Sequence, residues 1–171
     1  MGVDKTRPGR RAWAWLLWSA IVIVLDQVTK LYIVGNFEYR QRIEIMPLLD
    51  ITRLHNPGAA WSLLADAGGW QRWFFIALGS AVSLLIVYWL TRLRVPQERL
   101  LAVALSSILG GAIGNVIDRI IYGHVIDFIH AHYNEHYWPA FNVADMAISL
   151  GAILLIIDTV IAGKRQKNHS P

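Results

Sequence analysis

The chain has 171 residues, of which 55% are hydrophobic, and it carries eight tryptophans. This composition is too apolar for a soluble domain of that length, and the apolar residues fall in blocks, so a membrane protein is expected. The absence of cysteine excludes disulfides, a thiolate nucleophile and cysteine metal sites. The formal net charge of +4 is attributed to basic membrane anchors and does not indicate nucleic-acid binding.

Four apolar blocks are long enough, or nearly so, to cross a bilayer as helices of roughly 20 residues. They cover about residues 13–34, 73–90, 100–117 and 142–162. A polar turn at 91–99 separates the second and third blocks, and its Pro96 is expected to stop a helix. The first block leads directly into Asp26 without a small-residue cleavage site, so we interpret it as a retained span. The sequence therefore predicts one integral membrane domain, 1–171, with an all-α bundle of four transmembrane helices.

The distribution of lysine and arginine predicts the orientation of this bundle. Basic residues are denser in the N-terminal stretch, the 91–99 turn and the C-terminal tail than in segments 35–72 and 118–141. Short basic segments stay on the cytoplasmic side of a membrane. Both termini are therefore expected in the cytoplasm, with the two longer segments outside.

These two outer segments have patterns of their own. Residues 42–45 and 49–54 alternate apolar with polar, which is typical of half-buried strands, and Pro47 is expected to turn the chain between them. Residues 125–128 are expected to form another short strand, and 59–65 a short amphipathic piece. We expect a small extracytoplasmic β-sheet and loop subdomain on the outer leaflet.

Polar side chains gather near the outer ends of the predicted spans. Asp26 and Lys30 are four residues apart on the first helix, where such a spacing allows an ion pair. The others are Asn115, Asp118 and Arg119 on the third helix, Asn142 and Asp145 at the start of the fourth, and Asp127 in the loop between them. Ionisable groups at membrane depth are costly and are functional candidates by default. Their common depth suits a substrate that arrives from the membrane.

Five short motifs occur in order along nearly the whole chain. They are Asp26-Gln27-x-Thr29-Lys30, Asn56-x-Gly58-Ala59-Ala60, Gly110-Gly111-Ala112-x-Gly114-Asn115-x-x-Asp118-Arg119, Gly123-x-Val125-x-Asp127-Phe128 and Phe141-Asn142-x-Ala144-Asp145. This series resembles the motifs of lipoprotein signal peptidase, the type II signal peptidase of bacteria. The resemblance implies an aspartic endopeptidase of the inner membrane that needs no cofactor or metal. Its substrate would be a diacylglyceryl-modified prolipoprotein, cut just before the lipid-bearing cysteine.

The same resemblance implies roles for individual residues. Asp127 and Asp145 match the catalytic pair of that family. Other positions match the polar residues that surround this pair in the family and that also contact its peptide antibiotic inhibitor, globomycin. They are Asn56, Asn115, Arg119 and Asn142, with Gly58 beside Asn56. The enzyme is expected to work as a monomer among membrane lipids.

The chemistry of two close carboxylates agrees with this. They cannot both ionise cheaply, so one keeps a proton near neutral pH. The ionised one takes a proton from water, and the protonated one donates to the carbonyl oxygen. The pair titrates together, so the residues alone do not say which aspartate is the base.

The outer segment at 37–69 has two interpretations. It is expected to cover the aspartates, with Asn56 binding the substrate backbone and Gly58 leaving room for its approach. The alternative is a folded loop that only stabilises the helix ends.

Other interpretations remain for several groups. In one interpretation, Asp26 and Lys30 form only an ion pair at the end of the helix. In another, Asp118 and Arg119 form only an interfacial cap and anchor. A zinc hydrolase would use the histidines of His-x-His-x-x-x-His, which are His130, His132 and His136. A serine hydrolase is disfavoured because Ser106 and Ser107 lie within a span with no Lys or His at matching depth. A small transporter or assembly subunit would carry its charges at several depths.

Overall fold

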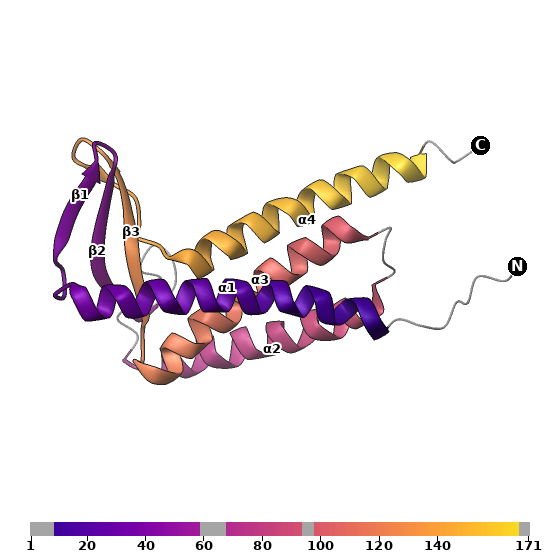
Figure 1. Ribbon diagram of the computed structural model, residues 1–171, viewed down its shortest axis with the longest axis horizontal. Helices are drawn as coiled ribbons and strands as arrows, with labels where there is room; N and C mark the ends of the chain where they lie inside the picture. Colours follow the sequence, from indigo (N-terminus) through magenta and orange to yellow (C-terminus); the bar gives the residue numbers. More distant parts are fainter. Residues whose placement is uncertain (1–8, 59–67, 94–97, 168–171) are drawn as a thin grey trace, which may run out of the picture.

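The computed structural model describes residues 9–58, 68–93 and 98–167. Its helices are α1 (Gly9–Asn36), α2 (Trp70–Arg92), α3 (Arg99–Ile121) and α4 (Val143–Lys167). All four are long and apolar enough to cross a membrane, which confirms the predicted bundle. They run along the long axis of the molecule, with the sheet at one end (Figure 1). The expected amphipathic piece at 59–65, and Pro96 in the 91–99 turn, lie outside the described residues.

Helix α3 is the centre of the bundle. In its most apolar stretch 56% of the residues are buried, compared with 28% in α1 and less in α2 and α4. Gly110 lets α1 approach closely, since an added Cβ would lie 2.7 Å from the Cβ of Val22. At Gly114 an added Cβ would lie 2.5 Å from a carboxylate oxygen of Asp26. Small residues allow close helix packing in membranes, and here they bring the polar groups of α1 and α3 together.

The sheet is antiparallel, with strand order β1-β2-β3-β4. Its strands are β1 (Arg42–Met46), β2 (Leu49–Asn56), β3 (Val125–Tyr133) and β4 (His136–Tyr137). The three expected strands are therefore present, but β3 continues five residues further than 125–128 and pairs with β4. Residues 129–132 continue the alternation of apolar and polar side chains, which is the pattern of a strand.

Two arginines attach the neighbouring elements to helix ends. Arg53 of β2 donates from Nη1 to the carbonyl oxygens of Val34 and Phe37, at 3.1 and 2.9 Å. Arg72 of α2 donates to the carbonyls of Arg119 and Ile120 near the end of α3, at 2.8 and 2.9 Å. The last carbonyls of a helix have no partner within it, and cations are favourable there. The sheet and α2 are thereby fixed relative to α1 and α3.

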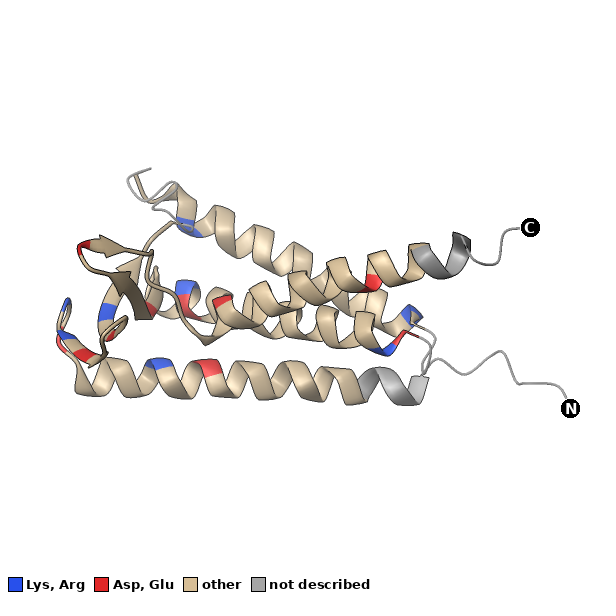
Figure 2. Ribbon diagram, turned by 90° about the horizontal axis from the view of Figure 1, so that it is seen from above, with Lys and Arg blue, Asp and Glu red and all other residues tan. Residues whose placement is uncertain are grey.

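Charged residues concentrate where the sheet meets the bundle. Figure 2 shows acidic and basic positions over the sheet and the adjoining helix segments, whereas long stretches of the helices carry none. Most of each span therefore presents only uncharged side chains. The polar groups described next lie at this junction.

Candidate functional site

Asp127 and Asp145 come together through one asparagine. Asp127 lies on β3 and is 3% exposed, whereas Asp145 is half-buried in the first turn of α4. Asn142 donates from Nδ2 to Asp127 Oδ1 at 2.7 Å, and its backbone N–H donates to Asp145 Oδ2 at 3.3 Å. The backbone N–H of Asp145 donates back to Asn142 Oδ1 at 3.0 Å. Such reciprocal bonds cap a helix start, so the cap of α4 also joins the two carboxylates.

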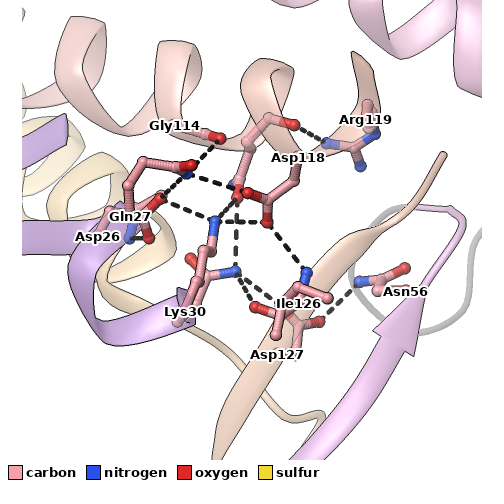
Figure 3. A network of polar contacts seen from close by, with 12 residues as sticks. Asp26, Gln27, Lys30, Asn56, Gly114, Asp118, Arg119, Ile126 and Asp127 are labelled. Atoms are coloured by element: carbon pink, nitrogen blue, oxygen red, sulfur yellow. Dashed lines mark hydrogen bonds and ion pairs between the residues drawn. The ribbon is translucent and has the colours of Figure 1, made fainter. Parts of the chain in front are cut away.

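The second oxygen of Asp127 is bound from β2. Asn56 donates from Nδ2 to Asp127 Oδ2 at 3.0 Å (Figure 3). Its own Oδ1 accepts the backbone N–H of Gly58 at 3.0 Å. Burial and the negative charge of Asp145 raise the pKa of Asp127 to about 7, although the bonds from Asn56 and Asn142 oppose this rise. Asp127 therefore exchanges a proton close to neutral pH.

Arg119 holds the turn after β2 against α3. Its side chain is 8% exposed, and its Nη2 donates to the carbonyl of Gly58 at 2.6 Å. Its Nη1 donates to the carbonyl of Asn115 at 3.3 Å, and its guanidinium lies 4.8 Å from the ring centre of Phe75. Its Nε has no hydrogen-bond partner among the described residues. Arg119 thus brings a positive charge to the aspartates without donating to either of them.

Lys30 forms a second cluster beside the first. Its ammonium lies 2.8 Å from Asp26 and 2.9 Å from Asp118, and it donates to Asn115 Oδ1 at 3.0 Å (Figure 3). Lys30 is 2% exposed and both aspartates are fully buried. Asn115 belongs to both clusters, since its Nδ2 donates to Asp145 at 2.8 Å.

This cluster corrects two of the sequence interpretations. The predicted Asp26–Lys30 pair exists, but it lies well inside α1 and not at its end, since α1 continues to Asn36. Asp118 is not an interfacial anchor, because it is fully buried, pairs with Lys30 and accepts the backbone N–H of Ile126 at 3.0 Å.

Gln27 is a further member of the buried cluster, although its motif alone indicates no role for it. Its Nε2 donates to Asp26, to the carbonyl of Gly114 and to Asp118, at 3.0 to 3.2 Å. The signal was its position three residues before Lys30, on one helix face. Gln27 therefore joins α1 to α3 in the buried cluster.

A cavity of about 570 Å³ is lined by Asp145 and by Asn56, the hydrogen-bond partner of Asp127. Its polar lining residues are Asn56, Asn115, Arg119, Asp145 and Ser149, and much of the rest of its wall is apolar. The apolar part includes Phe75 of α2, Met146 of α4 and the connection from Trp138 to Phe141. A concave, mostly apolar space with a few convergent polar groups is typical of a binding site.

The histidines considered for a zinc hydrolase and the serines considered for a serine hydrolase make other contacts in the structure. His132 Nε2 lies 3.3 Å from the buried Asp50, and both His130 and His132 pack against the ring of Tyr137. Among the described residues, no group of three His, Asp or Glu is placed to hold a metal. The two serines serve helix packing.

Both Ser106 and Ser107 take part in hydrogen bonds within the helix bundle. Ser106 donates to the carbonyl of Ala102 at 2.6 Å, and Ser107 accepts the indole N–H of Trp18 at 2.9 Å.

Comparison with known proteins agrees with this architecture. A family model described as signal peptidase (SPase) II matches residues 18–161. A lipoprotein signal peptidase of Acinetobacter baumannii (strain ATCC 17978) is 52% identical over 157 residues, covering 91% of this chain and 88% of the relative. One from Cellvibrio japonicus is 49% identical over 159 residues and covers 93% of each chain.

A solved structure of a bacterial membrane enzyme has the same fold. It superimposes with a TM-score of 0.77 at 32% identity and covers 92% of each chain. The family model spans most of the sequence, and half of the residues are shared with relatives over nine-tenths of it. This four-helix bacterial membrane protein therefore belongs to the signal peptidase II family.

Proposed function

We propose that the chain is an intramembrane aspartic endopeptidase that removes the signal peptide from diacylglyceryl-modified prolipoproteins, cutting just before the lipidated cysteine. Its relatives are named lipoprotein signal peptidases. The observation that carries the proposal is the bridge through Asn142, which joins Asp127 to Asp145, and Asp145 lines the cavity. Family membership supports the protease activity, and the bridge supports the aspartic chemistry.

The proposed reaction uses one proton on the pair. The ionised aspartate takes a proton from a water molecule, whose oxygen attacks the carbonyl carbon of the scissile peptide bond. The protonated aspartate donates to the carbonyl oxygen. The C–N bond of the resulting diol then breaks as the pair gives its proton to the leaving amine and takes one from a diol hydroxyl, so the carboxylic acid product forms and the pair again holds one proton. No cofactor takes part in these steps.

The surroundings of the pair have proposed roles in binding. Asn56, Asn115, Arg119 and Asn142, with Gly58, would contact the substrate backbone and a globomycin-like inhibitor. The segment at 37–69 would cover the pair, and its residues 59–67 lie outside the described ones. The contact of Asn56 with Asp127, and of Arg119 with Gly58, supports the cover because it attaches this segment directly to the site.

The location follows from the charge distribution of the sequence. We place the chain in the inner membrane as a monomer, with both termini in the cytoplasm and the sheet on the outer side. A lipid-anchored substrate would then reach the cavity from within the outer leaflet.

The deciding experiment is cleavage of a lipidated pre-lipoprotein by Asp127→Asn and Asp145→Asn. Asparagine keeps the shape of aspartate but cannot exchange a proton, so each variant is expected to lose at least on the order of 10²- to 10⁴-fold in turnover. Asp158→Asn, on the same helix as Asp145 but near its far end, is the matched control and is expected to retain activity. Substantial cleavage by either dyad variant would refute the aspartic mechanism.

A further inference from the structure

Lys30 is a cation whose three donors are all used. An ammonium group has three N–H donors and no acceptor. Here it faces one oxygen each of Asp26, Asp118 and Asn115, at 2.8, 2.9 and 3.0 Å. The end of the Asn115 side-chain amide that faces Lys30 must therefore be its carbonyl oxygen, Oδ1.

This contact orients the other end of the Asn115 amide. With Oδ1 on Lys30, the Nδ2 of Asn115 donates to Asp145 Oδ1 at 2.8 Å. Turning the amide by half a rotation would place its NH₂ group against the ammonium and its oxygen against the carboxylate. Both contacts would then be repulsive, so Lys30 fixes which end of Asn115 meets Asp145.

A donor on a carboxylate favours its ionised form. Asp145 receives this bond, a second one from the backbone N–H of Asn142, and the favourable field of the α4 N-terminus. The charges that face it are Lys30 of α1, Arg119 of α3 and Asp127 of β3. The hydrogen bonds and the two cations favour a negative charge on Asp145, whereas its burial opposes one.

Asp127 has less of this support, although the charges of Lys30 and Arg119 reach it as well. It lies on a strand, away from any helix start, and its two donors are the neutral side-chain amides of Asn56 and Asn142. Burial and the charge of Asp145 raise its pKa to about 7. The two aspartates are thus unequal.

We propose that Lys30 and Asn115 are positioning residues that keep Asp145 ionised and leave the shared proton on Asp127. This inference rests on the proposed function, because it makes Asp145 the base that activates water and Asp127 the acid that donates to the carbonyl oxygen. Lys30 acts only through the Asn115 amide and through its charge, and it does not touch the substrate.

Infrared titration of the carboxylic acid band in the purified full-length chain tests this without turnover. A band is assigned to Asp145 when Asp145→Asn in the same background removes it. At about pH 6, one unit below the pKa of about 7, the acid band of the unmodified chain is expected to disappear in Asp127→Asn. In that Asp127→Asn background, adding Asn115→Leu or Lys30→Met is expected to raise the Asp145 midpoint by about one pH unit or more.

Asp26→Asn in the same background is the control. It removes one carboxylate from Lys30 but leaves the contact between Lys30 and Asn115, so the Asp145 midpoint is expected not to rise. If Lys30→Met does not fold, Asn115→Leu carries the test, because it leaves both ion pairs of Lys30 in place.

Two results would overturn the assignment. One is an acid band at about pH 6 in the unmodified chain that Asp145→Asn removes and Asp127→Asn does not. The other is an Asp145 midpoint that Asn115→Leu leaves unchanged. Neither depends on cleavage, so failure of this inference is distinct from failure of the proposed function, which the cleavage assay decides.

Discussion

Four aspartates meet at the junction of the sheet and the bundle, and they divide into two kinds. Asp26 and Asp118 are fully buried and share the ammonium of Lys30. Asp127 and Asp145 receive hydrogen bonds from amides, and among the described residues no lysine or arginine donates to them. The first pair shares one cation, whereas the second is held by neutral donors and is the pair to which we assign the exchange of a proton. Because the residue type is the same, the partner determines the role.

The first prediction removes the cation that Asp26 and Asp118 share. Lys30→Met leaves two buried carboxylates without their cation, which typically costs about 3–5 kcal/mol of folding free energy. Unfolding measured in detergent should show this loss, while Asp145→Asn should change the same quantity far less because its partners remain neutral amides. Equal losses in the two variants would mean that both pairs serve stability alike.

The second prediction concerns how the titration of Asp127 makes the unfolding free energy depend on pH. The folded pKa of Asp127, about 7, is above its ordinary value of 3.8, so the folded chain binds the proton more tightly than the unfolded chain. The resulting stability is complete below about pH 4 and is lost as the pH rises through about 7. The difference in unfolding free energy between the unmodified chain and Asp127→Asn should therefore decrease between pH 4 and 7.

Cleavage should follow the same titration. Above about pH 7 both carboxylates become ionised, no acid remains for the carbonyl oxygen, and turnover should fall. A rate that stays constant well above pH 7 would show that the proton on Asp127 is not needed.

The third prediction concerns the bond that joins the sheet to the dyad. Asn56→Ala removes the donor to Asp127 and the acceptor for Gly58 N–H. Each of these two side-chain hydrogen bonds contributes about 1 kcal/mol to stability, so the melting temperature should fall only moderately. Cleavage and inhibitor binding should weaken together, by roughly tenfold for about 1.4 kcal/mol of lost interaction. A lower melting temperature with full activity of the folded enzyme would make this turn a scaffold.

The smallest effect is expected at the histidines of the sheet. Replacing His130, His132 and His136 together by alanine should reduce cleavage only modestly, because His132 faces Asp50 and not the dyad. Strong chelators should leave activity intact. Loss on chelation with rescue by zinc would favour a metal hydrolase instead.

Much of the architecture follows from the sequence because its signals are local. The lengths of the apolar blocks predict the helices, and the alternation at 42–45 and 49–54 predicts the strands. The proximity of Asp127 and Asp145 was inferred from their similar depth and from the family resemblance. The contact of Lys30 with Asp118 could not be found in this way, since helix spacing reports only pairs on the same helix. That contact depends on how closely α1 meets α3 at Gly110 and Gly114.

The attachment of Arg53 to the end of α1 makes the length of that helix a structural variable. Between Lys30, which is fixed in the buried cluster, and Val34, whose carbonyl Arg53 binds, lie four helical steps of about 1.5 Å each. One inserted residue would turn that carbonyl by about 100° around the helix axis and away from the sheet. We therefore expect homologous chains to change this stretch by whole turns of three or four residues, or to leave its length constant.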